Sequence, residues 1–159
     1  EGWGQFDSTK AAETLRTLDP DRLVDAASGW YDQGSGDVDS RHNYFYPLHL
    51  RPGARTVALS EYGGIAWPMP GHEPPRKTYG YGTAKTRAEL TERYQKLQRG
   101  TVLPQLKNGL SALVYTQVSD VEDEVNGLFT YDRAAIKPEP AVVRTVNEAL
   151  EKAFEEAVK

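Results

Sequence analysis

The chain has 159 residues, enough for one ordinary domain, and its 26% charged and 38% hydrophobic residues are typical of a soluble globular protein. Nineteen Lys and Arg are interspersed with 23 Asp and Glu, giving a formal net charge of -4, which argues against partners such as nucleic acid or anionic lipid. The lack of cysteine excludes disulfide bonds and thiolate chemistry, and the apolar stretches are too short to span a membrane. The compartment stays open.

The first predicted element is a helix over residues 8–18. Ala11, Leu15 and Leu18 recur there at helical spacing. Asp7, a residue type that favours helix N-caps, comes directly before this segment.

Four short runs of apolar and β-branched residues predict strands. They cover residues 22–28, 41–46, 56–61 and 111–117. Runs such as VALS and ALVY are continuous rather than alternating, which is typical of parallel strands covered on both faces by helices. We therefore expect an α/β fold.

Two more helices and two loops complete the expected secondary structure. Residues 62–83 contain too many prolines and glycines for regular structure and predict a surface loop. An amphipathic pattern over residues 85–107 predicts a long helix whose last turn a proline disturbs. The acidic residues 120–133 predict a loop, and a last helix begins at Pro138 or Pro140 and runs to residue 157.

Ligand sites in α/β folds lie at the carboxyl ends of the strands. Glu61 ends the third predicted strand, so we expect it at such an edge. The same reasoning gathers a second carboxylate, aromatic rings and polar side chains there: Glu1, Trp3, Trp30, His42, Asn43, Tyr44, Gln117 and Asp120.

Two carboxylates among indoles and phenols favour sugar chemistry. Aromatic faces stack on pyranose rings, and polar side chains select hydroxyl groups. Glycoside cleavage needs one protonated carboxyl and one ionised carboxylate. No metal-ligand spacing is present around His72 and His49, so we expect neither a metal nor a cofactor.

Several of these residues also have a purely structural interpretation. Glu61 could pair with an arginine at the strand end, and His42 could be a satisfied core histidine. Trp3 and Trp30 are as compatible with packing as with sugar binding. The acidic residues around Asp120 are typical of a solvated loop.

Three blocks of the sequence point to one enzyme family. They are EGWGQFD at the start, SEYGG at residues 60–64 and NGLFTYDR at residues 126–133. Together, and in this order, they resemble the catalytic barrel of glycoside hydrolase family 2, the family of β-galactosidases, β-glucuronidases and β-mannosidases. The resemblance implies a (β/α)8 TIM barrel of which residues 1–159 are the second half, about strands five to eight with their helices.

The resemblance also implies a role for each site residue. Glu61 matches the nucleophile of the family and Glu1 the general acid/base. Tyr44 matches the tyrosine that hydrogen-bonds and orients the nucleophile. The family's tryptophan near the end of the eighth strand is missing from YTQVSD, so Gln117 or Trp67 takes its place. The expected substrate-binding residues are Trp3, Trp30, His42, Asn43, Trp67, Gln117 and Asp120.

The implied activity is retaining hydrolysis of O-glycosidic bonds within a larger exo-β-glycosidase. Glu61 would attack the anomeric carbon while Glu1 protonates the leaving oxygen, with the two carboxyl groups ~5–5.5 Å apart. A half-barrel exposes sheet edges and an apolar face, so the expected partners besides carbohydrate are the rest of the barrel or a second copy. The alternative is a non-catalytic half-barrel that binds carbohydrate or self-assembles.

Overall fold

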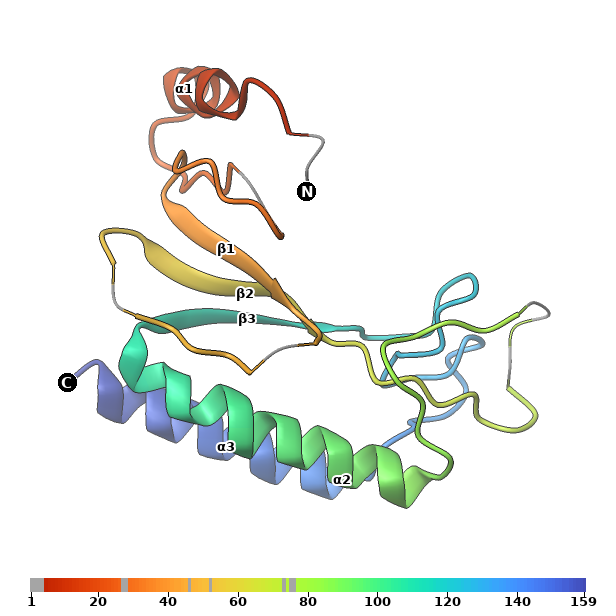
Figure 1. Ribbon diagram of the computed structural model, residues 1–159. Helices are drawn as coiled ribbons and strands as arrows, with labels where there is room; N and C mark the ends of the chain where they lie inside the picture. Colours follow the sequence, from red (N-terminus) through yellow and green to blue (C-terminus); the bar gives the residue numbers. More distant parts are fainter. Residues whose placement is uncertain (1–4, 27–28, 46, 52, 73, 75–76) are drawn as a thin grey trace.

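A three-stranded parallel sheet forms the centre of the molecule (Figure 1). The computed structural model describes residues 5–26, 29–45, 47–51, 53–72, 74 and 77–159. The strands are β1 (Val38–Asn43), β2 (Thr56–Gly63) and β3 (Leu110–Thr116), in the order β1-β2-β3.

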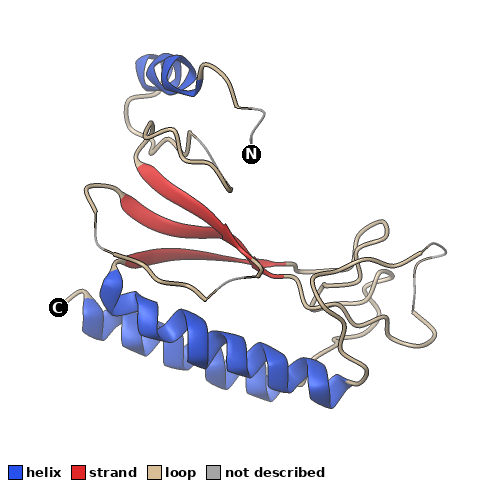
Figure 2. Ribbon diagram, viewed as in Figure 1, coloured by secondary structure: helices blue, strands red, loops and turns tan. Residues whose placement is uncertain are grey.

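Two long helices run side by side beneath one face of this sheet (Figures 1 and 2). They are α2 (Arg87–Leu97) and α3 (Pro140–Ala157), whereas α1 (Ser8–Leu18) stands beyond β1. No helix formed by the described residues combines the length and the apolar character that crossing a membrane requires.

The main core lies between the sheet and these two helices. Val57, Leu59 and Tyr62 of β2 point into it and are at most 3% exposed. Tyr94 of α2 and Val146 of α3 meet them from below. Removing this apolar surface from water is what holds the helices against the sheet.

The opposite face of the sheet differs from our expectation. The hydroxyl groups of Ser40 and Ser60 lie 2.6 Å apart there, and Val114 is 57% exposed. Both α2 and α3 lie on the other face. The prediction that helices cover the strands on both faces is therefore wrong, although the α/β class and the parallel pairing are confirmed.

The predicted half of a TIM barrel is wrong as well. The sheet has three strands instead of four, since residues 22–26 form no strand and residues 27–28 lie outside the described part. The N–H of Val24 donates to the Asp37 carboxylate at 2.8 Å, and its carbonyl accepts from the Asp37 N–H at 2.7 Å. These two contacts with Asp37 use the backbone groups of Val24 that a strand would need for pairing, and Leu23 is left 76% exposed.

The strand predicted at 41–46 forms three residues earlier, as β1, and the other predicted elements form close to their expected positions. The helices over 8–18 and 140–157 are confirmed, but the Asp7 side chain makes no cap hydrogen bond. The predicted helix over 85–107 is α2 followed by a π turn and then a 3₁₀ segment that contains Pro104. Proline has no N–H for the α-helical pattern, which accounts for the tightened end.

Candidate functional site

Glu61 lies near the carboxyl end of β2, directly opposite His42 of β1. The parallel register pairs Arg41 with Leu59 and then His42 with Glu61, so Ser60 is an extra residue in a β-bulge. A bulge redirects the side chains that follow it. Here it brings Glu61 Oε2 within 3.3 Å of His42 Nδ1, with the histidine side chain 1% exposed and the carboxylate 39% exposed.

Tyr44 follows β1 and holds the same carboxylate oxygen. Its phenol donates a hydrogen bond to Glu61 Oε2 at 2.8 Å, and the hydroxyl of Thr116 at the end of β3 lies 2.9 Å from the phenol oxygen. Burial of the phenol, together with the negative charge of Glu61, raises the pKa of Tyr44 well above its usual range. The phenol therefore keeps its proton and remains a donor to Glu61.

Aromatic rings surround this carboxylate. The Tyr44 ring stacks on Tyr81 with centroids 3.9 Å apart, and Trp30 meets the His42 ring edge-on at 5.6 Å. A hydrogen bond from the backbone N–H of His42 to the Gly29 carbonyl keeps the segment that contains Trp30 beside β1. Trp30 is 39% and Phe45 64% exposed, so these rings offer faces to a ligand.

The two glycines of SEYGG make room for aromatic rings. Gly63 and Gly64 have φ values of 98° and 62°, a region that other residues rarely adopt. A Cβ atom on Gly63 would lie 2.3 Å from the Tyr115 ring, and one on Gly64 would lie 2.6 Å from the Tyr81 ring. Gly64 therefore makes room for the Tyr81 ring beside the Glu61 site, and Gly63 makes room for the Tyr115 ring at the main core.

A second polar cluster follows β3. The Gln117 amide donates to Asn126 Oδ1 at 2.7 Å and to Glu124 Oε2 at 3.3 Å, and the Asn126 amide donates to Glu124 at 3.0 Å. Burial, a hydrogen bond with Tyr79 and the nearby carboxylates raise the pKa of Tyr81 to about 12. Because Glu61 and Glu124 both contribute to that rise, the two carboxylates act on the same phenol.

The structure leaves other predicted site residues in packing roles. The Asp120 carboxylate accepts from Lys137 Nζ at 2.8 Å and from the Gly127 N–H at 2.8 Å, with both side chains of the ion pair at most 2% exposed. Trp67 is 8% exposed and belongs to a small core with Ile65 and Leu90. Neither arrangement presents a group to a ligand.

Of the predicted site residues, the fold brings together Glu61, His42, Tyr44 and Trp30. Asn43 ends β1 and lines a neighbouring cavity, while Gln117 joins the cluster after β3. The predicted acid/base Glu1 and the predicted sugar-binding Trp3 lie outside the described residues.

Sequence reasoning missed Thr116, Tyr81 and Glu124. Tyr81 lies in TYGYG, where aromatic residues alternate with glycines, and this pattern could have indicated a ring beside a close backbone approach. Glu124 had no such signal, because its loop is rich in acids of which Glu122 and Asp123 are indeed exposed.

Comparison with protein-family models finds no match to this chain, and comparison with curated proteins finds none either. Within the described parts of the chain, no three His, Asp or Glu side chains are grouped so as to hold a metal ion. The function therefore has to be argued from the geometry around Glu61.

Proposed function

We propose that this chain carries the nucleophile of a retaining β-glycosidase and works as part of a larger exo-acting enzyme. The observation that carries the proposal is a partly exposed carboxylate, Glu61, held through one oxygen by the Tyr44 phenol at the end of a parallel sheet. A carboxylate nucleophile has to be oriented and must remain accessible to the sugar.

The contacts of Glu61 suggest which of its atoms reacts. Oε2 accepts from Tyr44 and faces His42, which leaves Oε1 to attack the anomeric carbon. As the bond from Oε1 to that carbon forms, the glycosidic C–O bond breaks, and Glu1 gives its proton to the leaving oxygen in the proposed scheme. Water then attacks the same carbon, gives a proton to Glu1 and releases Glu61 from the ester.

The surroundings of Glu61 support a sugar as the substrate. Trp30 and Phe45 offer exposed ring faces, and the partly exposed Glu61 carboxylate supplies polar atoms beside them. This combination of apolar faces and a few directed polar groups is typical of carbohydrate recognition. The resemblance of SEYGG and NGLFTYDR to the glycoside hydrolase blocks points the same way.

Covalent trapping tests the proposal most directly. A 2-fluoro β-glycoside series with galactose, glucuronate and mannose rings is incubated with this chain and with a longer polypeptide that contains it. We expect mass spectrometry to find the glycosyl ester on Glu61 in the longer polypeptide, and Glu61→Gln to abolish labelling. A glycosyl ester on another residue, or hydrolysis that survives Glu61→Gln, would contradict the assignment.

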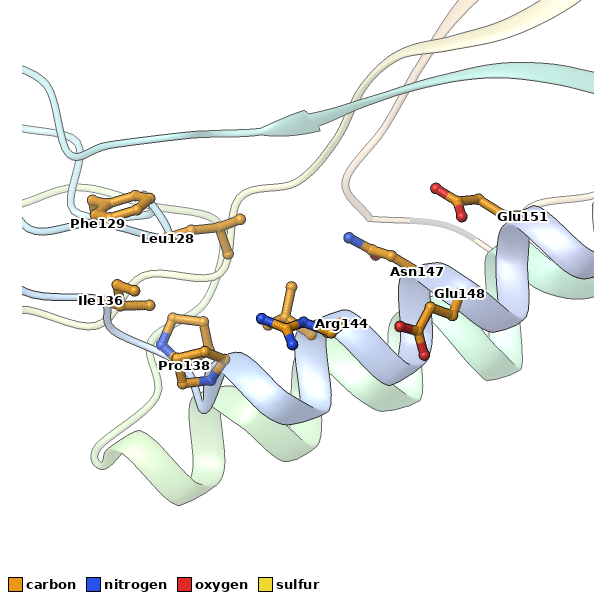
Figure 3. Close-up of a pocket in the computed structure, with 10 residues that line it drawn as sticks. Leu128, Phe129, Ile136, Pro138, Arg144, Asn147, Glu148 and Glu151 are labelled. Atoms are coloured by element: carbon orange, nitrogen blue, oxygen red, sulfur yellow. The ribbon is translucent and has the colours of Figure 1, made fainter.

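One observation favours the non-catalytic alternative. Within the described residues β3 pairs only with β2, and an apolar groove of about 390 Å³ lies nearby between α3 and residues 128–138 (Figure 3). Leu128, Ile136 and Val143 line this groove, so its apolar surface is suited to association. A concentration-dependent dimer that Ile136→Lys abolishes, with no labelling of Glu61, would favour self-assembly over catalysis.

A further inference from the structure

We propose that a second cavity, behind Tyr44 and Tyr81, binds a sugar that carries a phosphate or a carboxylate group. The cavity has a volume of about 540 Å³ and lies between the segment after β1 and α2. This volume is within the ~300–1,000 Å³ range of small-molecule sites. The inference does not depend on the glycosidase proposal, because Glu61 does not line this cavity.

Two cations define the chemistry of the ligand. Arg93 and Lys96 lie three residues apart on α2 and both line the cavity. Residues at this spacing share one face of a helix. The Arg93 guanidinium reaches Glu89 only at 3.8 Å, with both side chains more than one-third exposed, so this ion pair neutralises it weakly.

The described residues that line the cavity include no acidic side chain. A ligand entering it therefore meets two positive charges that no carboxylate among these described lining residues offsets. Arginine matches the oxygens of phosphate and carboxylate groups with paired donors, and lysine adds a point charge. The preferred ligand is thus anionic.

The remaining lining explains why the anion should be part of a sugar. The rings of Phe45 and Tyr81 meet at 66° with centroids 5.3 Å apart, and Phe45 is 64% exposed. These rings form an apolar surface on which the CH groups of a pyranose can rest. Asn43 and Thr101 supply an amide and a hydroxyl for the sugar hydroxyl groups.

The cavity shares a wall with the carboxylate site. The Tyr44 ring lines the cavity, while its phenol donates to Glu61. Tyr81 stacks on that ring, so a ligand resting on Tyr81 presses on the group that orients Glu61. A ligand in the cavity is therefore expected to change the orientation of Glu61 without contacting it.

Titration followed by two-dimensional NMR tests this inference. The probes are glucose 6-phosphate, glucuronate, glucose and inorganic phosphate, added to the full chain. We expect one or both anionic sugars to shift the amide signals of Lys96 and Thr101, and their relative affinities to decide between a phosphate and a carboxylate group. The anionic-sugar assignment would be overturned if glucose bound as tightly as glucose 6-phosphate and glucuronate. It would also be overturned if inorganic phosphate bound as tightly as these two anionic sugars.

Charge-removing variants provide the control. Lys96→Gln and Arg93→Gln should each weaken binding of the anionic sugar by about tenfold, the effect of losing one hydrogen bond to a charged group. Arg99→Gln, which removes an exposed charge just after α2 that does not line the cavity, should change it less than twofold. An equal loss of affinity in Arg99→Gln, or an unchanged affinity in Lys96→Gln, would overturn the proposed site. The absence of any binding to the wild-type chain would overturn it as well.

Discussion

The phenol of Tyr44 connects Glu61 of β2 to Thr116 of β3 through hydrogen bonds of 2.8 and 2.9 Å. Tyr44 itself follows β1, so all three strand ends meet at one oxygen atom. Because the phenol has a single proton and gives it to the carboxylate, the Thr116 hydroxyl must donate to the phenol. Glu61 is therefore held by a chain of donors that reaches across the sheet.

Replacing Tyr44 with phenylalanine should slow the reaction of Glu61 with a glycoside more than it impairs folding. The variant loses a hydrogen bond to a charged group, worth about 1.5–3 kcal/mol, so trapping of the glycosyl ester should slow by about 10- to 100-fold. The rate of ester formation, followed by mass spectrometry, measures this. Tyr131→Phe is the matched control, because Tyr131 is 47% exposed and should react at the wild-type rate.

Gly64→Ala should destabilise the protein and disturb the ring pair. An alanine at a φ of 62° costs about 1–3 kcal/mol, and its Cβ would also displace the Tyr81 ring. Urea denaturation should show a lower free energy of unfolding. Gly100→Ala has nothing within 4 Å of the added Cβ in a helical turn, and it should be neutral or stabilising by up to about 1 kcal/mol. Equal effects of the two substitutions would refute this explanation of the glycine.

Removing one partner of the buried Lys137–Asp120 pair should destabilise strongly. Lys137→Met leaves the Asp120 carboxylate at 2% exposure without its cation, a change that typically costs about 3–5 kcal/mol. The double variant Lys137→Met/Asp120→Asn should lose less than the sum of the two single losses. For comparison, Glu139→Gln breaks the exposed Arg87–Glu139 pair and should change the free energy of unfolding by less than about 1 kcal/mol.

The free energy of unfolding should fall at low pH, in part because the Asp132 carboxylate becomes protonated. The Thr130 hydroxyl, the Ala134 N–H and His72 hold the pKa of Asp132 well below that of an unfolded aspartate. The unfolded chain therefore takes up a proton first as the pH drops below about 5, and stability is lost from there down through the native pKa. Urea midpoints between pH 6 and pH 2 should show a smaller loss in Asp132→Asn than in wild type. Glu122→Gln, an exposed carboxylate outside this cluster, should leave the wild-type loss unchanged.

Much of the secondary structure follows from local patterns. The helices at 8–18 and 140–157 need only helical spacing and a proline or polar residue at the start, so the first is predicted at its observed bounds and the second with a start at Pro138 or Pro140. The strands β2 and β3 are likewise recognisable from apolar runs. The expected strand at 22–28 failed because Asp37, which is distant in sequence from Val24, binds the backbone of that segment. A local pattern contains no information about such a contact.

The sequence by itself predicted Glu61 and Tyr44 near the carboxyl ends of two strands, since apolar runs and breaking residues are local properties. The exact ends differ, because β1 already stops at Asn43, before Tyr44, and β2 continues to Gly63. Only the tertiary structure decided that the two side chains share a hydrogen bond, because that depends on the register of β1 against β2. The bulge at Ser60 sets this register, and it is visible only in how the two strands pair. The same holds for the Tyr81 ring and for the buried Lys137–Asp120 pair, whose partners are brought together by packing between distant segments.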